Sequence, residues 1–312
     1  MKFYNIMAEL WICIRWLSLK LLFSMCQFFF GRTQKVERAL IKIGNFVFRA
    51  QFSLSLFQNY GSYVSQYSCN LDPFLMLQED RWLRDKTILD IGSGLGQYSV
   101  LLIENGAKKV VSLEYQYDKI SWAFDHLYGT KNILFVNGSA EALPFKQDEF
   151  DSIFSHTVFE HINDIKSTLS SIKRVLKNNG LVILNFNYIH HRGGHHLFPY
   201  IHFPWAPWLI SEKALCSYWS DCLSRDQKKG LMSFYPKDCN VAMLSDGDEI
   251  HLNKMNFDEF ENIVKEAGFR IIERKTSEVI GQVFPFLTRI PKLKYFLSGT
   301  IFYVLARNEH RL

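Results

Sequence analysis

The feature that most constrains the fold is a short apolar run that ends in three closely spaced glycines. It reads Ile88-Leu-Asp-Ile-Gly-Ser-Gly-Leu-Gly96, and a helical pattern begins at Gln97. Glycines let the backbone approach a ligand closely, and the following helix offers its free N-terminal amides. A dinucleotide-binding turn would place its third glycine at position 97, where this chain has Gln. Asp90, just before the glycines, suits a cationic ligand better than a pyrophosphate.

Apolar strand patterns alternate with helical patterns after this point. Strands are predicted at 87–91, 110–113, 133–136, 152–154 and 181–186, and helices at 97–105, 117–127 and 165–176. A helix at 257–267 and strands at 269–274 and 300–306 are predicted to complete the domain. Strict alternation predicts an α/β fold, a Rossmann-like parallel sheet with helices on both faces. Glu114 ends the second strand, twenty residues after Gly94, where a carboxylate can accept both hydroxyls of a ribose.

These residues resemble the class I S-adenosylmethionine-dependent methyltransferases whose first motif is LDIGSGxG. The resemblance continues through 137–145, Phe150-Asp151, Ser155-His-Thr-Val-Phe-Glu-His161 and 174–184, and more loosely through 257–307. It implies S-adenosylmethionine as cofactor, an antiparallel last strand and methyl transfer as the reaction.

The resemblance also implies a set of cofactor-binding residues. Asp90, Gly92 and Gly94 would surround the methionine part, Glu114 the ribose, and Ser139 with Ala140 the adenine. Ser93, Gly96 and Ser155 complete the set. Many relatives carry Asp where Ser139 stands, so we expect weaker discrimination of adenine, because a hydroxyl accepts a hydrogen bond without charge assistance.

Candidate catalytic residues are histidines, because methyl transfer to a hydroxyl needs a group that takes its proton. His156 and His161 follow the fourth strand at the edge where ligands bind in open parallel sheets. Each has a structural alternative, a backbone contact to the cofactor for His156 and a structural pair with Glu160 for His161. His195 and His196 belong to a group of five histidines at 190, 191, 195, 196 and 202. We predict no metal ligands, because no pair has a strong ligand spacing and Thr157 stands where some quinone-pathway relatives carry a carboxylate.

Residues 187–256 interrupt the alternation and are predicted to form an inserted cap rich in His and aromatic residues. Its aromatic rings suit a sugar ring or a lipid-like chain, or else the core of a helical cap. The favoured reaction is therefore O-methylation of a glycan or a lipid-linked small molecule. The alternatives are a nicotinamide-dependent oxidoreductase and a non-catalytic, membrane-bound scaffold that keeps the cofactor pocket.

Residues 1–50 are apolar and basic, with eight Lys or Arg against Glu9 and Glu37, a net charge of +6 in a chain of net +5. Such an excess favours an anionic membrane surface as partner, and residues 51–312 are too nearly neutral to favour nucleic acid. The longest stretch without charge, 21–30, is too short to span a bilayer. We predict attachment in the membrane interface, with packing against a domain or partner and a true span as alternatives.

The predicted domain organisation has four parts. They are the N-terminal segment 1–50, the cofactor-binding part 51–186, the cap 187–256 and the C-terminal completion 257–312. Six cysteines without paired spacing indicate free thiols in a reducing compartment. Together with the N-terminal segment, they predict a cytoplasmic protein held peripherally at the membrane.

Overall fold

The computed structural model describes most of the chain, and every structural statement below concerns these residues. They are 2–52, 82–127, 129–187, 201–222 without 212, 216 and 219, then 253, 255–276 and 300–308.

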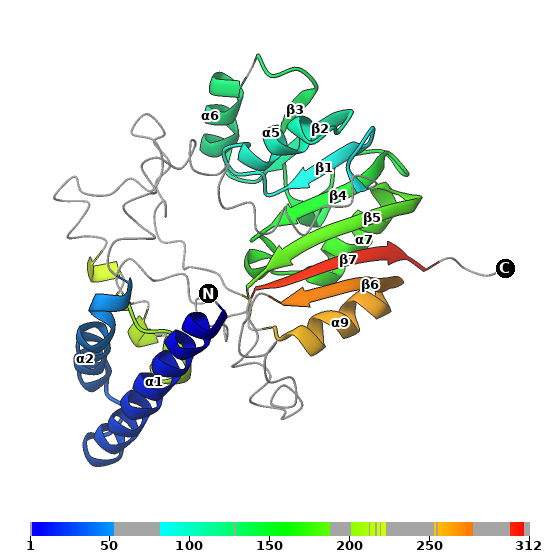
Figure 1. The fold of residues 1–312 in the computed structure, drawn as a ribbon. Coiled ribbons are helices and arrows are strands. Elements are labelled where there is room, and N and C mark those ends of the chain that lie inside the picture. Colours follow the sequence, from blue (N-terminus) through cyan, green and yellow to red (C-terminus); the bar gives the residue numbers. More distant parts are fainter. Residues whose placement is uncertain are drawn as a thin grey trace.

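A seven-stranded sheet forms the centre of the larger domain (Figure 1). Its strands are β1 (Thr87–Ile91), β2 (Lys109–Glu114), β3 (Ile133–Asn137), β4 (Phe150–His156), β5 (Leu176–Phe186), β6 (Phe269–Thr276) and β7 (Ile301–Arg307). They lie in the order β3-β2-β1-β4-β5-β7-β6. β1 to β5 are parallel, whereas β7 runs antiparallel to both β5 and β6. The predicted Rossmann-like fold and its antiparallel last strand are confirmed.

Helices cover both faces of the sheet, which explains why its strands are apolar on both sides. The helices are α5 (Gln97–Glu104), α6 (Tyr117–Leu127), α7 (Ile165–Val175) and α9 (Phe257–Glu266). Leu89 and Ile91 pack in the cluster that contains the buried side chains of α7 and α9. Ile88 packs with Leu102 of α5 in a second cluster on the opposite face.

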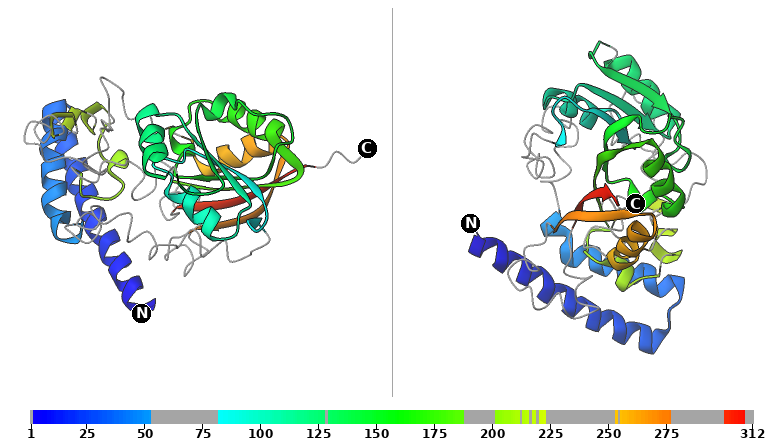
Figure 2. Two further views of the ribbon diagram at one scale, coloured as in Figure 1. Left: turned by 90° about the horizontal axis from the view of Figure 1, so that it is seen from above. Right: turned by 90° about the vertical axis from the view of Figure 1, so that its right-hand side faces the viewer.

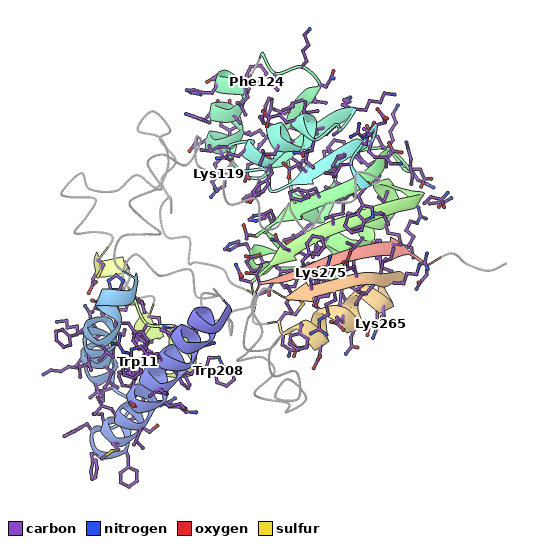
Figure 3. All side chains as sticks on the ribbon, viewed as in Figure 1. Trp11, Lys119, Phe124, Trp208, Lys265 and Lys275 are labelled. Atoms are coloured by element: carbon purple, nitrogen blue, oxygen red, sulfur yellow. The ribbon has the colours of Figure 1, made fainter. Side chains whose placement is uncertain are left out.

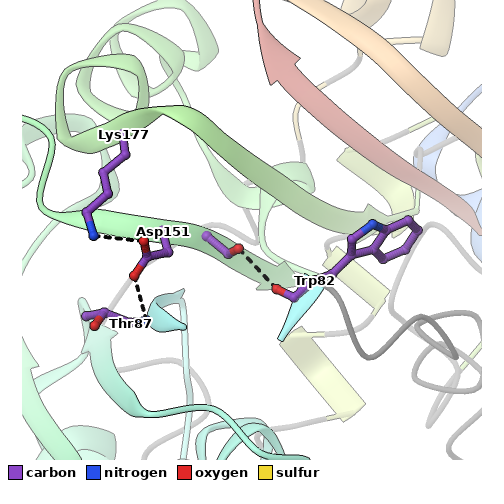
Figure 4. A network of polar contacts seen from close by, with 5 residues as sticks. Trp82, Thr87, Asp151 and Lys177 are labelled. Atoms are coloured by element: carbon purple, nitrogen blue, oxygen red, sulfur yellow. Dashed lines mark hydrogen bonds and ion pairs between the residues drawn. The ribbon is translucent and has the colours of Figure 1, made fainter. Parts of the chain in front are cut away.

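β5 begins five residues earlier than predicted, directly after the last residue of α7. Polar contacts hold this early part of the strand (Figure 4). Lys177 Nζ lies 2.8 Å from Asp151 Oδ1, and the other oxygen of Asp151 accepts the Thr87 amide at 2.9 Å. Asp151 therefore joins the starts of β1, β4 and β5, which explains why the Asn-Asn-Gly sequence at 178–180 does not end the element as a loop.

A separate helical unit lies beside the sheet domain (Figure 2). It consists of α1 (Lys2–Phe30), α2 (Gln34–Phe52) and the described residues of 201–222, which include the short helix η5 (Ala206–Trp208). All three parts share one hydrophobic cluster. The edge of Trp16 meets Trp205 with ring centroids 5.7 Å apart, and Phe23 meets Phe203 at 6.0 Å.

The N-terminal segment and part of the inserted cap therefore form one body, although the sequence suggested two separate parts. Phe203 and Trp205 are fully buried in it. The sequence suggested two roles for the aromatic residues of the cap. For this pair, the role in the core of a helical cap is confirmed. A sugar platform made of Phe203 and Trp205 is wrong.

Polar contacts also join the described residues of 201–222 to α1 and α2. Gln27 Nε2 donates to the Leu209 carbonyl at 3.0 Å, the His202 amide donates to Asn45 Oδ1 at 2.7 Å, and buried Glu37 accepts the Ser211 amide at 3.0 Å. Arg38 forms an ion pair with Asp221. These contacts fix how residues 201–222 lie on α1 and α2.

By length and composition, α1 contains a window apolar enough to cross a membrane, Cys13–Phe30. This window is longer than the charge-free stretch that the sequence analysis considered, because the helix continues through Lys20 and Arg15 lies within it. The same test is passed by core helices and signal sequences.

Candidate functional site

The three glycines lie at the carboxyl end of β1, and all have a positive φ, of 70°, 58° and 82° for Gly92, Gly94 and Gly96. Their surroundings differ. A Cβ on Gly92 would lie 2.3 Å from Val158 Cγ2, and one on Gly96 would lie 2.8 Å from Leu127 Cδ1. A Cβ on Gly94 would meet only Gln97 Oε1, at 4.0 Å. Gly92 and Gly96 thus fit the turn against the protein, while Gly94 presents its backbone to open space.

Glu114, at the end of β2, lies directly beside this turn. Its Oε2 accepts the Gly94 amide at 2.8 Å and its Oε1 accepts the Gln116 amide at 2.9 Å. The sequence spacing therefore corresponds to a direct contact across the strand ends. Each carboxylate oxygen keeps acceptor capacity for a further donor. The ribose role of Glu114 stays a prediction.

Asp90 is buried within β1, 1% exposed, and accepts a 2.6 Å hydrogen bond from the Ser99 hydroxyl of α5. Burial raises the pKa of Asp90 to about 7; the Ser99 hydrogen bond opposes this rise and the nearby Glu114 carboxylate adds to it. A carboxyl group in this state is half protonated near neutral pH, and a cation placed beside it would favour its charged form.

The serines of the predicted cofactor set have identifiable structural roles. The Ser155 hydroxyl donates to the Ile91 carbonyl at 3.2 Å, joining β4 to β1. Ser139 Oγ accepts the Glu141 amide at 3.2 Å and caps the short helix η3 (Ala140–Ala142), which contains Ala140. Ser93 Oγ is buried without a hydrogen-bond partner among the described residues. Ser93 therefore has a polar atom available at the glycine turn.

His156 is the last residue of β4, and both of its ring nitrogens are engaged. Nε2 shares a 2.9 Å hydrogen bond with the Tyr98 hydroxyl, and Nδ1 lies 3.1 Å from Thr157 Oγ1. The Tyr98 ring stacks on the imidazole at 4.3 Å. Burial lowers the pKa of His156 to about 4, against the opposing effect of a backbone hydrogen bond. This geometry favours a neutral positioning residue over a proton acceptor.

The turn after β4 contains features that the sequence analysis missed. Thr157 has a φ of 53°, which is rare for a β-branched residue and typical of strained functional turns. The side-chain amide of Asn253 donates to the carbonyls of Phe159 and Ile162, and the Asn253 amide donates to the Glu160 carbonyl at 2.8 Å. Asn253 comes from the insert, 91 residues after Ile162, so no local pattern marks it as part of this turn.

Glu160 belongs to the same turn, in the short helix η4 (Phe159–His161), and its side chain is 1% exposed. Burial raises the pKa of this carboxyl group to about 8, while its backbone hydrogen bonds, including one from Asn187, lower it. His161 beside it is exposed. The catalytic candidates His195 and His196 lie outside the described residues, and a search of the described ones finds no group of three metal-ligating side chains.

Comparison with known proteins assigns the central part of the chain. Residues 89–184 match the family described as "Methyltransferase domain". This segment matches a methyltransferase domain, and its sheet has the Rossmann-like order expected for the S-adenosylmethionine-dependent class. The assignment favours the predicted class over the nicotinamide-dependent oxidoreductase.

The methyltransferase domain has several curated relatives. An uncharacterized methyltransferase, YcgJ of Bacillus subtilis, is 28% identical over 116 residues, covering 36% of this chain and 46% of its own. The tRNA U34 carboxymethyltransferase of Ruthia magnifica is 33% identical over 108 residues, 33% of each chain. The C-methyltransferase UbiE of ubiquinone and menaquinone biosynthesis in Wigglesworthia glossinidia is 34% identical over 109 residues, 33% of this chain and 44% of that one. The chain thus spans less than half the length of these relatives.

One similar solved structure is a Haloferax volcanii methyltransferase in complex with the activator Trm112. The likeness covers 82% of this chain and 97% of that one, with a TM-score of 0.50 and 16% sequence identity. At this identity the comparison shows the fold alone, and the fold is the one described above.

The residues present fit S-adenosylmethionine. The cofactor carries a cationic amino group and sulfonium, which suit the buried Asp90 carboxyl, and a ribose, which suits Glu114. Gly94 leaves open space beside Glu114, and Ser93 Oγ is an additional polar atom in the same turn. Residues Asp90, Ser93, Gly94 and Glu114 would therefore hold the methionine and ribose parts.

The raised pKa of Asp90 predicts pH-dependent cofactor binding. A cationic amino group binds the charged carboxylate more tightly, so the affinity for S-adenosylhomocysteine should rise with pH through about 7. We expect roughly tenfold weaker binding at pH 6 than at pH 8, since about one carboxyl group in ten is charged one pH unit below its pKa. Titration calorimetry across this range tests it, with Asp90→Asn as the variant that should bind weakly at every pH. An unchanged affinity in the wild-type protein would contradict the assignment.

Glu160 predicts a pH-dependent stability. Its folded pKa lies above its ordinary value, so its contribution is fully present below about pH 4.5 and is lost as pH rises through about 8. Glu160→Gln removes this loss. We expect the variant to melt at least about 5 °C above the wild type at pH 9, and close to it at pH 5. Circular dichroism melts at the two pH values measure this, and a difference in Tm that is equal at both would contradict it.

Proposed function

We propose that the whole chain is an S-adenosylmethionine-dependent methyltransferase whose acceptor is a hydroxyl group on a lipid-linked small molecule or glycan. The main support for this activity is that Asp90, the glycine turn and Glu114 lie together at the carboxyl ends of β1 and β2. The acceptor class rests on the N-terminal helical unit, which carries apolar side chains on its surface.

The bound cofactor would supply an activated methyl group, and the remaining steps belong to the chain. Held by Asp90, Gly94 and Glu114, the cofactor would offer its methyl carbon to the acceptor oxygen. The new oxygen–carbon bond would form as the carbon–sulfur bond breaks, and the acceptor hydroxyl would give up its proton. Most of the rate acceleration can come from alignment, with proton removal adding about 10²- to 10⁴-fold where it is used. Tyr98 and Thr157 hold His156 at the edge of the site, where it would orient neighbouring groups.

Among the described residues, Glu160 is the buried titratable group closest in sequence to His156 in the turn after β4. At pH 7 it is mostly protonated, because its pKa is about 8. It would therefore donate a hydrogen bond to an acceptor oxygen at neutral pH and gain the ability to take a proton above pH 8. The histidines of the insert at 195 and 196 stay candidates for the proton acceptor.

The curated relatives differ in their acceptors, since they include a tRNA carboxymethyltransferase and a quinone C-methyltransferase. We favour a lipid-linked hydroxyl because residues 51–312 carry no basic excess for RNA. Methylation of a ring carbon in a lipid-like acceptor would use the same cofactor site, and its product would carry a carbon–methyl bond in place of a methyl ether.

The test uses the full-length protein with S-adenosylmethionine labelled in its methyl group and a chloroform–methanol lipid extract of the cells that make it. We expect label in the organic phase that survives alkaline hydrolysis, since a methyl ether survives and a methyl ester releases methanol. Label in an RNA fraction, or alkali-labile label, would overturn the proposed acceptor. Binding of S-adenosylhomocysteine without transfer to any fraction would instead favour the non-catalytic scaffold.

A further inference from the structure

The exposed side of α1 is an apolar surface, which we call the outer face. Its side chains are 41% to 83% exposed, and Figure 3 labels one of them, Trp11. The outer face consists of Trp11, Ile14, Leu17, Leu21, Leu22, Met25, Phe28 and Phe29. At 3.6 residues per turn these positions fall within about 140° of the helix circumference. A contiguous exposed patch of this kind marks an interaction site.

The charged residues that interrupt the apolar sequence do not lie on the outer face. Arg15 and Lys20 lie beyond its two edges, one on each side, about 90° and 130° from its centre. Both bend along tryptophan rings, with Arg15 Cζ 5.1 Å from the Trp11 ring centroid and Lys20 Nζ 5.3 Å from that of Trp16. The polar hydroxyl of Ser18, within the face, donates to the Ile14 carbonyl at 3.1 Å and so is satisfied inside the helix.

The opposite side of α1 is occupied by the protein itself. Trp16, Leu19 and Phe23 are at most 3% exposed in the cluster shared with α2 and residues 201–222. A membrane-spanning α1 would carry this cluster into the bilayer, together with the buried Glu37 and the ion pair between Arg38 and Asp221. Charged groups are rare and costly at that depth. The geometry therefore fits a helix lying in the plane of the membrane.

We propose that the outer face of α1 inserts into the interface of an anionic lipid bilayer and holds the helical unit there. Arg15 and Lys20 at its edges, and Arg32 just after its end, would meet lipid phosphates. Exposed Lys35 and Lys42 of α2 add to the same attraction. A second copy of this chain fits the face less well, because pairing would bring the same three cations of both copies together. The inference does not depend on methyl transfer.

The test is vesicle flotation of the full-length protein with phosphatidylcholine alone or mixed with phosphatidylglycerol. We expect flotation with the mixed vesicles, reduced by high salt, and at least about tenfold weaker binding for the double variant Leu17→Asn with Leu21→Asn. The matched control is Phe124→Asn with Leu134→Asn, which changes two side chains of the sheet domain that are 47% and 48% exposed. Figure 3 labels Phe124, far from α1.

Three results would overturn the proposal. One is equal flotation of the double variant and the wild type. Another is binding to phosphatidylcholine as strong as to the mixed vesicles, or binding that high salt leaves unchanged, as a span would give. The third is a dimer in lipid-free solution, seen by light scattering, that the double variant dissociates. Calorimetric binding of S-adenosylhomocysteine by the double variant shows that it is folded.

Discussion

Replacing Glu114 by alanine should weaken S-adenosylhomocysteine binding by about 10- to 100-fold. The loss has two sources. The ribose hydroxyls would lose their carboxylate acceptor, which costs about 1–3 kcal/mol when the partners stay buried. The amides of Gly94 and Gln116 would lose the carboxylate oxygens they bond at 2.8 and 2.9 Å, so the glycine turn would also loosen.

Calorimetric titration of the full-length protein measures this effect, with two comparison variants. Glu114→Gln keeps an oxygen acceptor for one amide and should fall between the wild type and the alanine variant. Glu104→Ala removes an exposed carboxylate at the end of α5 and should bind normally. An alanine variant that binds within twofold of the wild type would remove Glu114 from the cofactor site.

Replacing Gly92 by alanine should abolish measurable cofactor binding and destabilise the domain by about 2–5 kcal/mol. The left-handed backbone, φ 70°, costs about 1–2 kcal/mol for a residue with a Cβ. The new Cβ would also overlap Val158 Cγ2, 2.3 Å away, and overpacking adds about 1–3 kcal/mol. Val158 lies in the turn between Thr157 and Glu160, so relief of this overlap would displace the turn after β4.

Denaturant unfolding and calorimetry measure the two effects of Gly92→Ala separately. Gly129→Ala is the control, because a Cβ there meets nothing within 4 Å. Adding Val158→Ala removes the overlap and leaves the backbone strain, so the double variant should recover part of the stability that Gly92→Ala loses. No recovery would mean that the backbone conformation alone decides the cost.

Local sequence patterns predicted the sheet domain well, because each of its signals is local. The glycine turn, its preceding strand and Glu114 follow one another within 28 residues, and their contact needs only two adjacent parallel strands. The turn after β4 was harder to predict. Asn253 reaches it from the insert, and no local sequence pattern predicts the strained backbone of Thr157.

The insert and the N-terminus were predicted less well, for the same physical reason. Periodicity shows that a helix face is apolar, and it does not show which distant segment covers it. Gly44 illustrates this, since it appears in a helical pattern without an evident role. A Cβ there would lie 2.5 Å from the Phe203 ring, so a glycine in α2 makes room for an aromatic residue of the insert.

The shared core of the helical unit also delays the folding of α1, because its packing partners are synthesised much later. Leu209, the partner of Gln27, is synthesised 182 residues after it, and Trp205 follows its partner Trp16 after a similar interval. At translation rates of about 5–20 residues per second, this interval lasts roughly 10–40 s. During this interval, the inner side of α1 lacks the partners that residues 201–222 later provide. Strands β1 to β5 are synthesised within the same interval, so this side of α1 is open to chaperones and lipid while most of the sheet domain is being made.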